Sequence, residues 1–256
     1  MLPYWRLSAY YFFYFAFIGA FFPYFSLYLA ALNFSAWDIG VLMSLVQVMR
    51  MAAPNLWGWL ADRLGAKTPI VRVAALLSLI GFCGVLLTRS FGGLFIAIAL
   101  LGFFWSAALP LVETLTLGHL GARINRYGSI RLWGSIGFIG AVLGVGYLLD
   151  RLPIDSLLWL SLILLGGIFL CSLLIPEVER PPSHIEQPPL LDILRQPQVV
   201  RLLTACFFMS AAHGALYVFY SIHLVDHGYS KSLTRFSLVS PHPSPVRGAV
   251  AHRTNR

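Results

Sequence analysis

The chain has 256 residues, of which 58% are hydrophobic and only 11% are charged. Soluble domains are about 45–50% apolar and about 25% charged, so this composition excludes a soluble enzyme and a soluble nucleic-acid-binding module. The net charge of +8 does not indicate nucleic acid either, because half of it comes from four arginines in the last 24 residues. With a mean hydropathy of +0.77, the chain is predicted to be a polytopic, all-α membrane protein.

Seven membrane spans are predicted, because seven stretches each offer about the 20 apolar residues that a spanning helix needs. Residues 176–200, between the sixth and seventh span, are rich in proline and carry mixed charge, which is typical of a solvent-exposed linker. In chain order the predicted spans are 8–32, 38–61, 70–88, 92–116, 130–149, 155–175 and 201–224.

Basic residues near the span ends predict the orientation, since cytoplasmic loops carry an excess of Lys and Arg. With the N-terminus in the cytoplasm, the outer loops between spans hold only Arg89 and Arg151. The N-terminus and the linker 176–200 are therefore expected inside, in a cell inner membrane. The inner loops then hold Arg6, Arg63, Lys67, Arg72, Arg123, Arg126, Arg131, Arg180, Arg195 and Arg201.

An internal repeat is visible in the first six spans. Gly58–Leu64 recurs as Gly146–Leu152, with five of seven residues identical. Three spans separate the two copies, so they have opposite orientations in the membrane. Inverted three-helix repeats are a mark of secondary transporters, which place the substrate near the middle of the membrane between the repeats.

The loop after the second span resembles a family signature. Gly58–Lys67 (GWLADRLGAK) is similar to the G-x-x-x-D-R-x-G-R-[RK] motif of the major facilitator superfamily, with Ala66 at a position that is often basic. This resemblance implies a six-helix N-terminal bundle (1–175) followed by one helix of a second bundle (201–224). Asp62 is expected at the N-terminus of a neighbouring helix, paired with a basic residue. The motif residues expected to control loop conformation are Gly58, Asp62, Arg63, Gly65 and Lys67.

A second resemblance concerns the branch of that superfamily that contains the lactose and phenylpropionate permeases. Pro110–Glu113 and Tyr127–Ser135 are similar to this branch, and so are Arg50 and Ala211–Tyr217. It implies proton-coupled symport of a small organic anion, with an aromatic carboxylate as the expected substrate. Small neutral sugars and nucleosides are the alternative substrates. The residues expected to bind substrate are Arg50, Glu113, Arg131, His213 and Tyr217.

Ionisable residues inside spans point to function, because each costs about 2.5–3.5 kcal/mol or more to insert. Glu113 is interpreted as the proton-binding carboxylate, since burial favours its neutral form and a nearby arginine its charged form. Arg50 suits a carboxylate substrate, which a guanidinium binds through two hydrogen bonds. His213 is a second candidate for proton coupling. The structural alternatives are a static Glu113–Arg131 ion pair, an Arg50 paired within the protein, and a packing histidine at 213.

Two other interpretations are weighed. An intramembrane serine protease is disfavoured, because the serine of Gly134–Gly137 stands one residue too early for its nucleophile pattern and the sixth span lacks histidine. The other is a truncated, non-transporting product: residues 233–256 are basic, contain no acid and suggest a frameshift, so the second bundle is expected to be missing. No cofactor and no metal are expected, since the proton gradient drives transport and the cysteines lack metal-ligand spacing.

Overall fold

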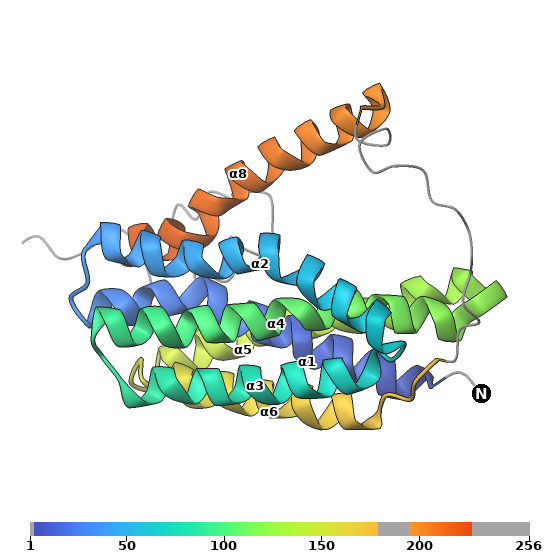
Figure 1. The fold of residues 1–256 in the computed structure, drawn as a ribbon. Helices are drawn as coiled ribbons and strands as arrows, with labels where there is room; N and C mark the ends of the chain where they lie inside the picture. Colours follow the sequence, from blue (N-terminus) through green and yellow to red (C-terminus); the bar gives the residue numbers. More distant parts are fainter. Residues whose placement is uncertain (1–2, 179–194, 227–256) are drawn as a thin grey trace, which may run out of the picture.

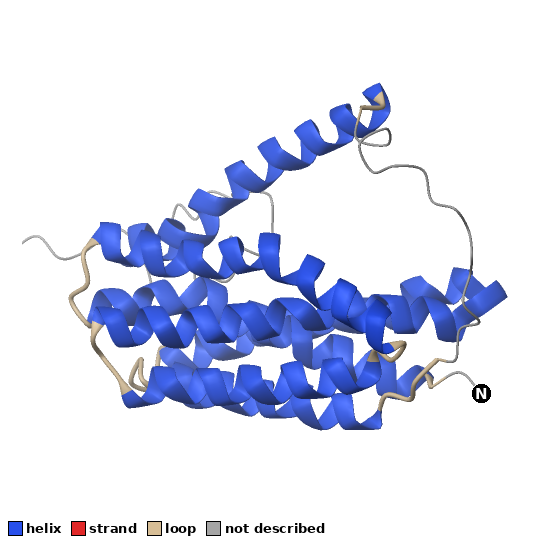
Figure 2. Cartoon of the chain, viewed as in Figure 1, coloured by secondary structure: helices blue, strands red, loops and turns tan. Residues whose placement is uncertain are grey.

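The structure, a computed structural model, describes residues 3–178 and 195–226, with side chains between 212 and 226 described only at Ile222. The described residues are helices and loops without a strand (Figure 2), which confirms the all-α prediction. Each of the seven predicted spans overlaps one α-helix. The helices are α1 Tyr4–Ala31, α2 Ala36–Leu64, α3 Thr68–Leu87, α4 Phe91–Leu120, the 3₁₀ helix η1 Gly121–Arg126, α5 Tyr127–Leu149, α6 Ser156–Leu174 and α8 Pro197–Asp226.

Five segments of the described chain are long and apolar enough to cross a membrane, and one of them, Phe91–Leu149, contains both α4 and α5. In α8, the stretch Pro197–Ala211 is apolar but shorter. The tail 233–256 and most of the linker 176–200 lie outside the described residues.

Helices α1 to α6 form one bundle, and α8 extends away from it above α2 (Figure 1). Helix α1 lies at the centre, in contact with α5, α6 and α2. It is apolar around its whole circumference, as expected of a helix surrounded by protein. Its aromatic rings fill the core rather than face lipid: Tyr10, Tyr14, Phe17, Phe21, Tyr24 and Tyr28 are all at most 2% exposed.

Glycines let α1 and α5 approach backbone to backbone. A Cβ atom added at Gly137 of α5 would collide with the carbonyl oxygen of Phe12 in α1. One added at Gly19 of α1 would lie 2.6 Å from the carbonyl oxygen of Phe138 in α5. In both contacts the obstacle is backbone, which cannot rotate away as a side chain could.

Gly137→Ala is therefore expected to destabilise the bundle by about 1–3 kcal/mol, the usual cost of overpacking a core. Gly140→Ala is the matched control on the same helix, because a Cβ atom there meets nothing within 4 Å. In an exposed helical position it is expected to be neutral or to stabilise by up to about 1 kcal/mol. Thermal unfolding of the purified variants in detergent measures both, and equal midpoints would contradict the predicted close packing.

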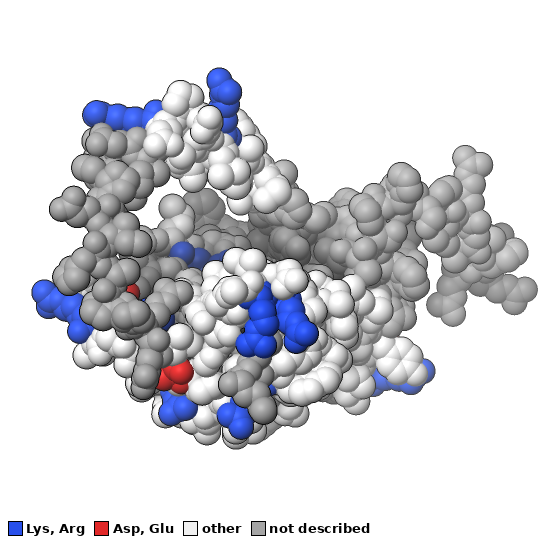
Figure 3. Space-filling model, turned by 90° about the vertical axis from the view of Figure 1, so that its right-hand side faces the viewer, with Lys and Arg blue, Asp and Glu red and all other residues white. Residues whose placement is uncertain are grey.

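Basic residues gather at one end of the bundle. Helix α2 ends there at Leu64 and α5 begins there at Tyr127 (Figure 1). Viewed from this end, Lys and Arg outnumber Asp and Glu on the surface (Figure 3). The repeated segments Gly58–Leu64 and Gly146–Leu152 lie at opposite ends, as an inverted repeat requires. Which side of the membrane the basic end faces stays a prediction.

Candidate functional site

Three of the predicted substrate residues come from three different helices of the bundle: Arg50 from α2, Glu113 from α4 and Arg131 from α5. Arg50 lies over Trp105, which stacks on Tyr14 of α1, and Arg131 lies over Phe15 and Tyr11 of the same helix. Glu113 accepts a hydrogen bond from Tyr127, one turn before Arg131 in α5. The fold therefore brings together charges that lie far apart in the sequence. The site also contains aromatic and hydroxyl side chains that the sequence analysis did not assign to it.

Arg50 is exposed and makes its polar contact within its own helix. Its Nη1 donates to Oε1 of Gln47 at 3.3 Å, and its Cζ lies 5.9 Å from the centre of the Trp105 ring. No carboxylate of the described residues forms an ion pair with it. The guanidinium thus keeps its charge available, which argues against the alternative in which Arg50 is neutralised inside the protein.

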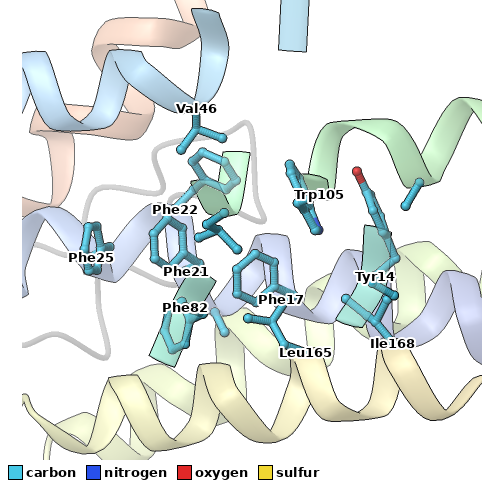
Figure 4. Packing of buried hydrophobic residues seen from close by; sticks show 14 of the residues in the cluster. Tyr14, Phe17, Phe21, Phe22, Phe25, Val46, Phe82, Trp105, Leu165 and Ile168 are labelled. Carbon is cyan, nitrogen blue, oxygen red and sulfur yellow. The ribbon is translucent and has the colours of Figure 1, made fainter. Parts of the chain in front are cut away.

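Beneath Arg50, Trp105 and Tyr14 form an aromatic stack. Their ring centres are 4.7 Å apart and their planes differ by 4°, and Figure 4 shows the two rings side by side between α4 and α1. Trp105 also meets Phe17 edge-on at 5.7 Å. Both stacked rings are 2% exposed, so this stack belongs to the hydrophobic core beneath Arg50.

Glu113 is half-buried and faces α5. The hydroxyl of Tyr127 donates to its Oε1 at 3.5 Å. No ion pair joins Glu113 to Arg131 in the described chain, so the predicted alternative of a static clamp between α4 and α5 is not what the structure shows. Glu113 is instead a carboxylate held by a neutral donor.

Arg131 lies over the rings of α1. Its Cζ is 3.8 Å from the centre of Phe15 and 5.7 Å from that of Tyr11. Gly134, one turn later, makes room for this arrangement, because a Cβ there would lie 2.7 Å from the Phe15 ring and 2.8 Å from Nη1 of Arg131. Arg131 borders an open groove of about 370 Å³, which is also lined by Phe15, Ile18, Ser135, Phe138 and Ile139.

The loop motif lies at the turn between α2 and α3. Gly65 ends α2 with φ +65°, a left-handed conformation that favours glycine. Arg63 lies 4.4 Å from the ring centre of Trp59. Gly58 makes no close approach to another helix, because a Cβ there meets nothing within 4 Å in the described chain.

The expectation that Asp62 lies at the N-terminus of a neighbouring helix is wrong, whereas its expected pairing with a basic residue is found. Asp62 pairs with Lys67 of its own loop at 3.8 Å, and a different carboxylate occupies the nearby helix N-terminus. Oε2 of Glu177, just after α6, accepts a 2.7 Å hydrogen bond from the backbone N–H of Thr68, the first residue of α3. An anion is stabilised at this position by the free N–H groups and the helix dipole.

Arg72 of α3 caps the C-terminal end of α6, just as Glu177 caps the N-terminal end of α3. From the first turns of α3 it donates to the carbonyl oxygens of Ser172, Leu173 and Ile175, at 3.1 to 3.4 Å, at the end of α6. The N-terminus of α3 thus receives a negative charge from the segment after α6, and the C-terminus of α6 receives a positive charge from α3. The reciprocal caps fix the chain where it leaves the bundle.

The pKa of Glu177 is lowered. Partial burial disfavours its charge, but hydrogen bonds from the backbone of Thr68 and Lys67 outweigh that effect. A carboxyl whose pKa is lower in the folded state adds stability that is present above its unfolded pKa of about 4.3 and is lost as the pH falls through the folded value.

Glu177→Gln is therefore expected to lower thermal stability near neutral pH, with the deficit shrinking as the pH falls below about 4. Unfolding midpoints of both proteins across this range measure the effect. Asp150→Asn, at the C-terminal end of α5, is the control and is expected not to reproduce the pattern. Parallel curves for wild type and Glu177→Gln would contradict the role of the cap.

His213 and Tyr217 lie within α8, but their side chains are outside the described residues. Helix α8 contacts α1 and α2, and Ile222 packs on the core. Among the described residues no group of three His, Cys, Asp or Glu side chains could hold a metal ion.

Comparison with known proteins decides the family. Residues 4–239 match the MFS_1 like family. The chain belongs to this family. An MFS_1 like protein is a multi-pass membrane transporter and not an enzyme, so the protease interpretation is excluded. The match extends to residue 239, into the segment 233–256 that sequence analysis assigns to a tail outside the family.

Curated relatives of this MFS_1 like chain include the maltose permease of Geobacillus stearothermophilus, 35% identical over 204 residues that cover 78% of the chain and 51% of the permease. The probable 3-phenylpropionic acid transporter of Escherichia coli (strain K12) is 26% identical over 230 residues, covering 87% and 59%. The chain spans about half the length of the curated relatives it matches. The crystal structure of the nucleoside transporter NupG matches with a TM-score of 0.71 at 19% identity, over 93% of this chain and 63% of that one, and shows the fold.

The residues missed by sequence reasoning are aromatic and hydroxyl neighbours of the three charges. Tyr127 precedes Arg131 by four residues, and Thr116 follows Glu113 by three, spacings that place each pair on one helix face. This spacing could have marked Tyr127 and Thr116 as site residues. The sequence holds no comparable signal for Tyr11, Tyr14 and Trp105, because aromatic residues are 14% of the chain and therefore do not stand out.

Proposed function

We propose that this protein is a proton-coupled symporter of a small organic anion, with Arg50 and Arg131 binding the anion and Glu113 carrying the proton. The observation that supports this is the absence of an ion pair between either guanidinium and any carboxylate of the described chain. Guanidiniums without an internal counter-ion, on helices of an apolar membrane bundle, favour an anionic ligand.

The charge balance of the site supports coupling. Two arginines and one ionised Glu113 leave one net positive charge. Binding one carboxylate together with one proton leaves that net charge unchanged, so the loaded and the empty site meet the same electrostatic barrier in the apolar bundle. Binding the anion without a proton would change the net charge of the site. Transport of the anion together with a proton is therefore favoured over transport of the anion alone.

The aromatic surroundings favour an aromatic carboxylate. Arg50 faces Trp105, and Arg131 covers Phe15. An aromatic acid offers a ring to pack on Phe15, which lines the groove beside Arg131, and a carboxylate for the guanidiniums. The 26% identical relative is named as a probable 3-phenylpropionic acid transporter, which is in line with this substrate class.

We further propose His213 as a second proton-binding group and Tyr217 as a substrate contact on α8. The loop residues Asp62, Arg63 and Lys67 are proposed to adjust the α2–α3 turn during transport.

The protein is proposed to lie in a cell inner membrane with its N-terminus in the cytoplasm. A second helical bundle is proposed as the partner of the bundle of α1 to α6. A reporter-fusion map that placed residues 176–200 outside would contradict this orientation.

The test is uptake of labelled aromatic and aliphatic carboxylates by a two-bundle version of the carrier in liposomes, with and without an inward proton gradient. Accumulation of an aromatic carboxylate only with the gradient is expected. Equal accumulation with and without the proton gradient would contradict proton coupling.

A neutral sugar is the second candidate substrate, because the maltose permease shares 35% identity with this chain. Aromatic rings and a carboxylate such as Glu113 also suit sugar hydroxyls. Competition separates the two candidates in the same liposomes. A sugar that blocks carboxylate uptake shares its site, whereas accumulation of sugars and no carboxylate would replace the anion proposal.

A further inference from the structure

Arg131 and Glu113 lie near each other without forming an ion pair. Glu113 accepts a hydrogen bond from the hydroxyl of Tyr127 at 3.5 Å. Tyr127 stands four residues before Arg131 on α5, a spacing that places both side chains on one face of the helix. The ion pairs among the described side chains do not include Arg131. In apolar surroundings a guanidinium and a nearby carboxylate attract each other strongly, so another contact has to hold Arg131 in place.

Phe15 of α1 covers one face of the Arg131 guanidinium. Cζ of Arg131 lies 3.8 Å from the centre of the Phe15 ring, and the negative face of an aromatic ring attracts a cation at this distance. Tyr11, one turn earlier on α1, lies 5.7 Å from the same Cζ. The stack therefore joins α1 to α5, whose backbones already meet at Gly137.

Gly134 makes room for both members of this stack. A Cβ atom there would lie 2.7 Å from Cδ2 of Phe15 and 2.8 Å from Nη1 of Arg131, so a larger residue would push the ring or the guanidinium aside. Arg131 and Phe15 both border the open groove of about 370 Å³. A contact through the face of the guanidinium leaves its N–H donors, which lie in its plane, for a ligand in that groove.

We propose that Phe15 is a positioning residue that, together with Gly134, holds Arg131 ready for the substrate and away from Glu113. The proposal rests on the proposed role of Arg131 in binding the anion. Without the ring, Arg131 pairs with Glu113, and its donors are no longer offered to a substrate carboxylate. Phe15 thus keeps the anion-binding group and the proton-binding group of the site apart.

The test is the rate at which phenylglyoxal modifies Arg131 in the purified 256-residue chain, followed by mass spectrometry of the peptide that contains it. The reagent attacks the neutral guanidine, and a paired carboxylate slows it by favouring the charged form. Phe15→Leu is expected to slow the modification of Arg131 roughly 3- to 10-fold. Adding Glu113→Gln to Phe15→Leu should restore at least the wild-type rate, because the competing carboxylate is gone. Glu113→Gln alone should leave the rate unchanged.

Two controls accompany these variants. Phe15→Tyr keeps the ring and should react like the wild type. Arg151, which lies 3.9 Å from the centre of the Tyr147 ring, is measured in the same samples, and its rate should not change. If Phe15→Leu fails to fold, Gly134→Ala disturbs the same stack from the α5 side and should show the same slowing and the same rescue by Glu113→Gln.

The outcomes separate the positioning role from the proposed function. An unchanged or faster rate at Arg131 in Phe15→Leu would overturn the positioning role. So would a slower rate that Glu113→Gln does not reverse, because a purely structural effect of losing the ring does not depend on residue 113.

Protection of Arg131 by 3-phenylpropionate is measured in a two-bundle version of the carrier. Protection in the wild type is expected, with about 10-fold more ligand needed in Phe15→Leu. The expected pattern of rates without protection at any concentration would support the role of Phe15 and overturn the anion site of the proposed function.

Discussion

Glu113→Gln is expected to abolish proton-driven accumulation of the substrate in a two-bundle version of the carrier. The amide keeps the size of the side chain and can still accept from Tyr127, but it cannot take up a proton. The glutamine is a permanent analogue of protonated Glu113, so the carrier should still exchange substrate across the membrane. Without a proton to carry, the internal concentration should not exceed the external one.

Two assays on the same liposomes check this result: net uptake with an inward proton gradient, and exchange of labelled for unlabelled substrate without one. Asp150→Asn serves as the control, since it removes a carboxylate at the far end of α5 and should accumulate substrate normally. Wild-type accumulation by Glu113→Gln would remove Glu113 from the proton path. If Glu113→Gln loses exchange in addition to accumulation, Glu113 takes part in substrate binding.

Arg50→Lys is expected to weaken carboxylate binding by roughly 10- to 100-fold, or about 1.4–2.7 kcal/mol. The ammonium keeps the positive charge but offers a single point of contact in place of a planar pair of donors. It also loses the flat face that Arg50 presents toward Trp105. Inhibition of uptake by a series of unlabelled carboxylates measures the change.

Arg151→Lys is the matched control, because Arg151 also lies over an aromatic ring, 3.9 Å from the centre of Tyr147, but just after α5 and outside the proposed site. Its affinity for substrate should equal that of the wild type. If Arg50→Lys binds carboxylates normally and the control does too, Arg50 is a packing residue. Equal losses in both variants would point to a general effect of replacing an arginine on the fold.

The helices could be predicted from sequence because each apolar stretch matches the length of a span and is separated from the next by residues such as Gly65 and Ser90. Ser90 accepts from the backbone N–H of Gly93 and begins α4, a local signal. The charges Arg50, Glu113 and Arg131 could also be found, since ionisable groups are conspicuous in apolar surroundings.

The contacts among those residues could not be predicted. Whether Arg131 pairs with Glu113 or lies over Phe15 depends on the rotation of α5 against α1, which glycines at 134 and 137 permit and tertiary packing sets. The capping of α3 by Glu177 rather than Asp62 likewise depends on where the chain leaves α6. Neither arrangement is encoded in the local sequence around a single span.

The burial of α1 has a consequence for biogenesis. This helix leaves the ribosome before the other described helices, and its backbone partner α5 begins only at Tyr127, a delay of roughly 5–20 s at ordinary rates of synthesis. During that interval the hydroxyls of Tyr11 and Tyr24 have none of their partners from α4 and α5, inside a membrane that offers no replacement. Nascent α1 therefore has to wait beside the insertion machinery or a chaperone. Substitutions at the α1–α5 contact should then appear first as degradation of newly made chains, before any defect in transport can be measured.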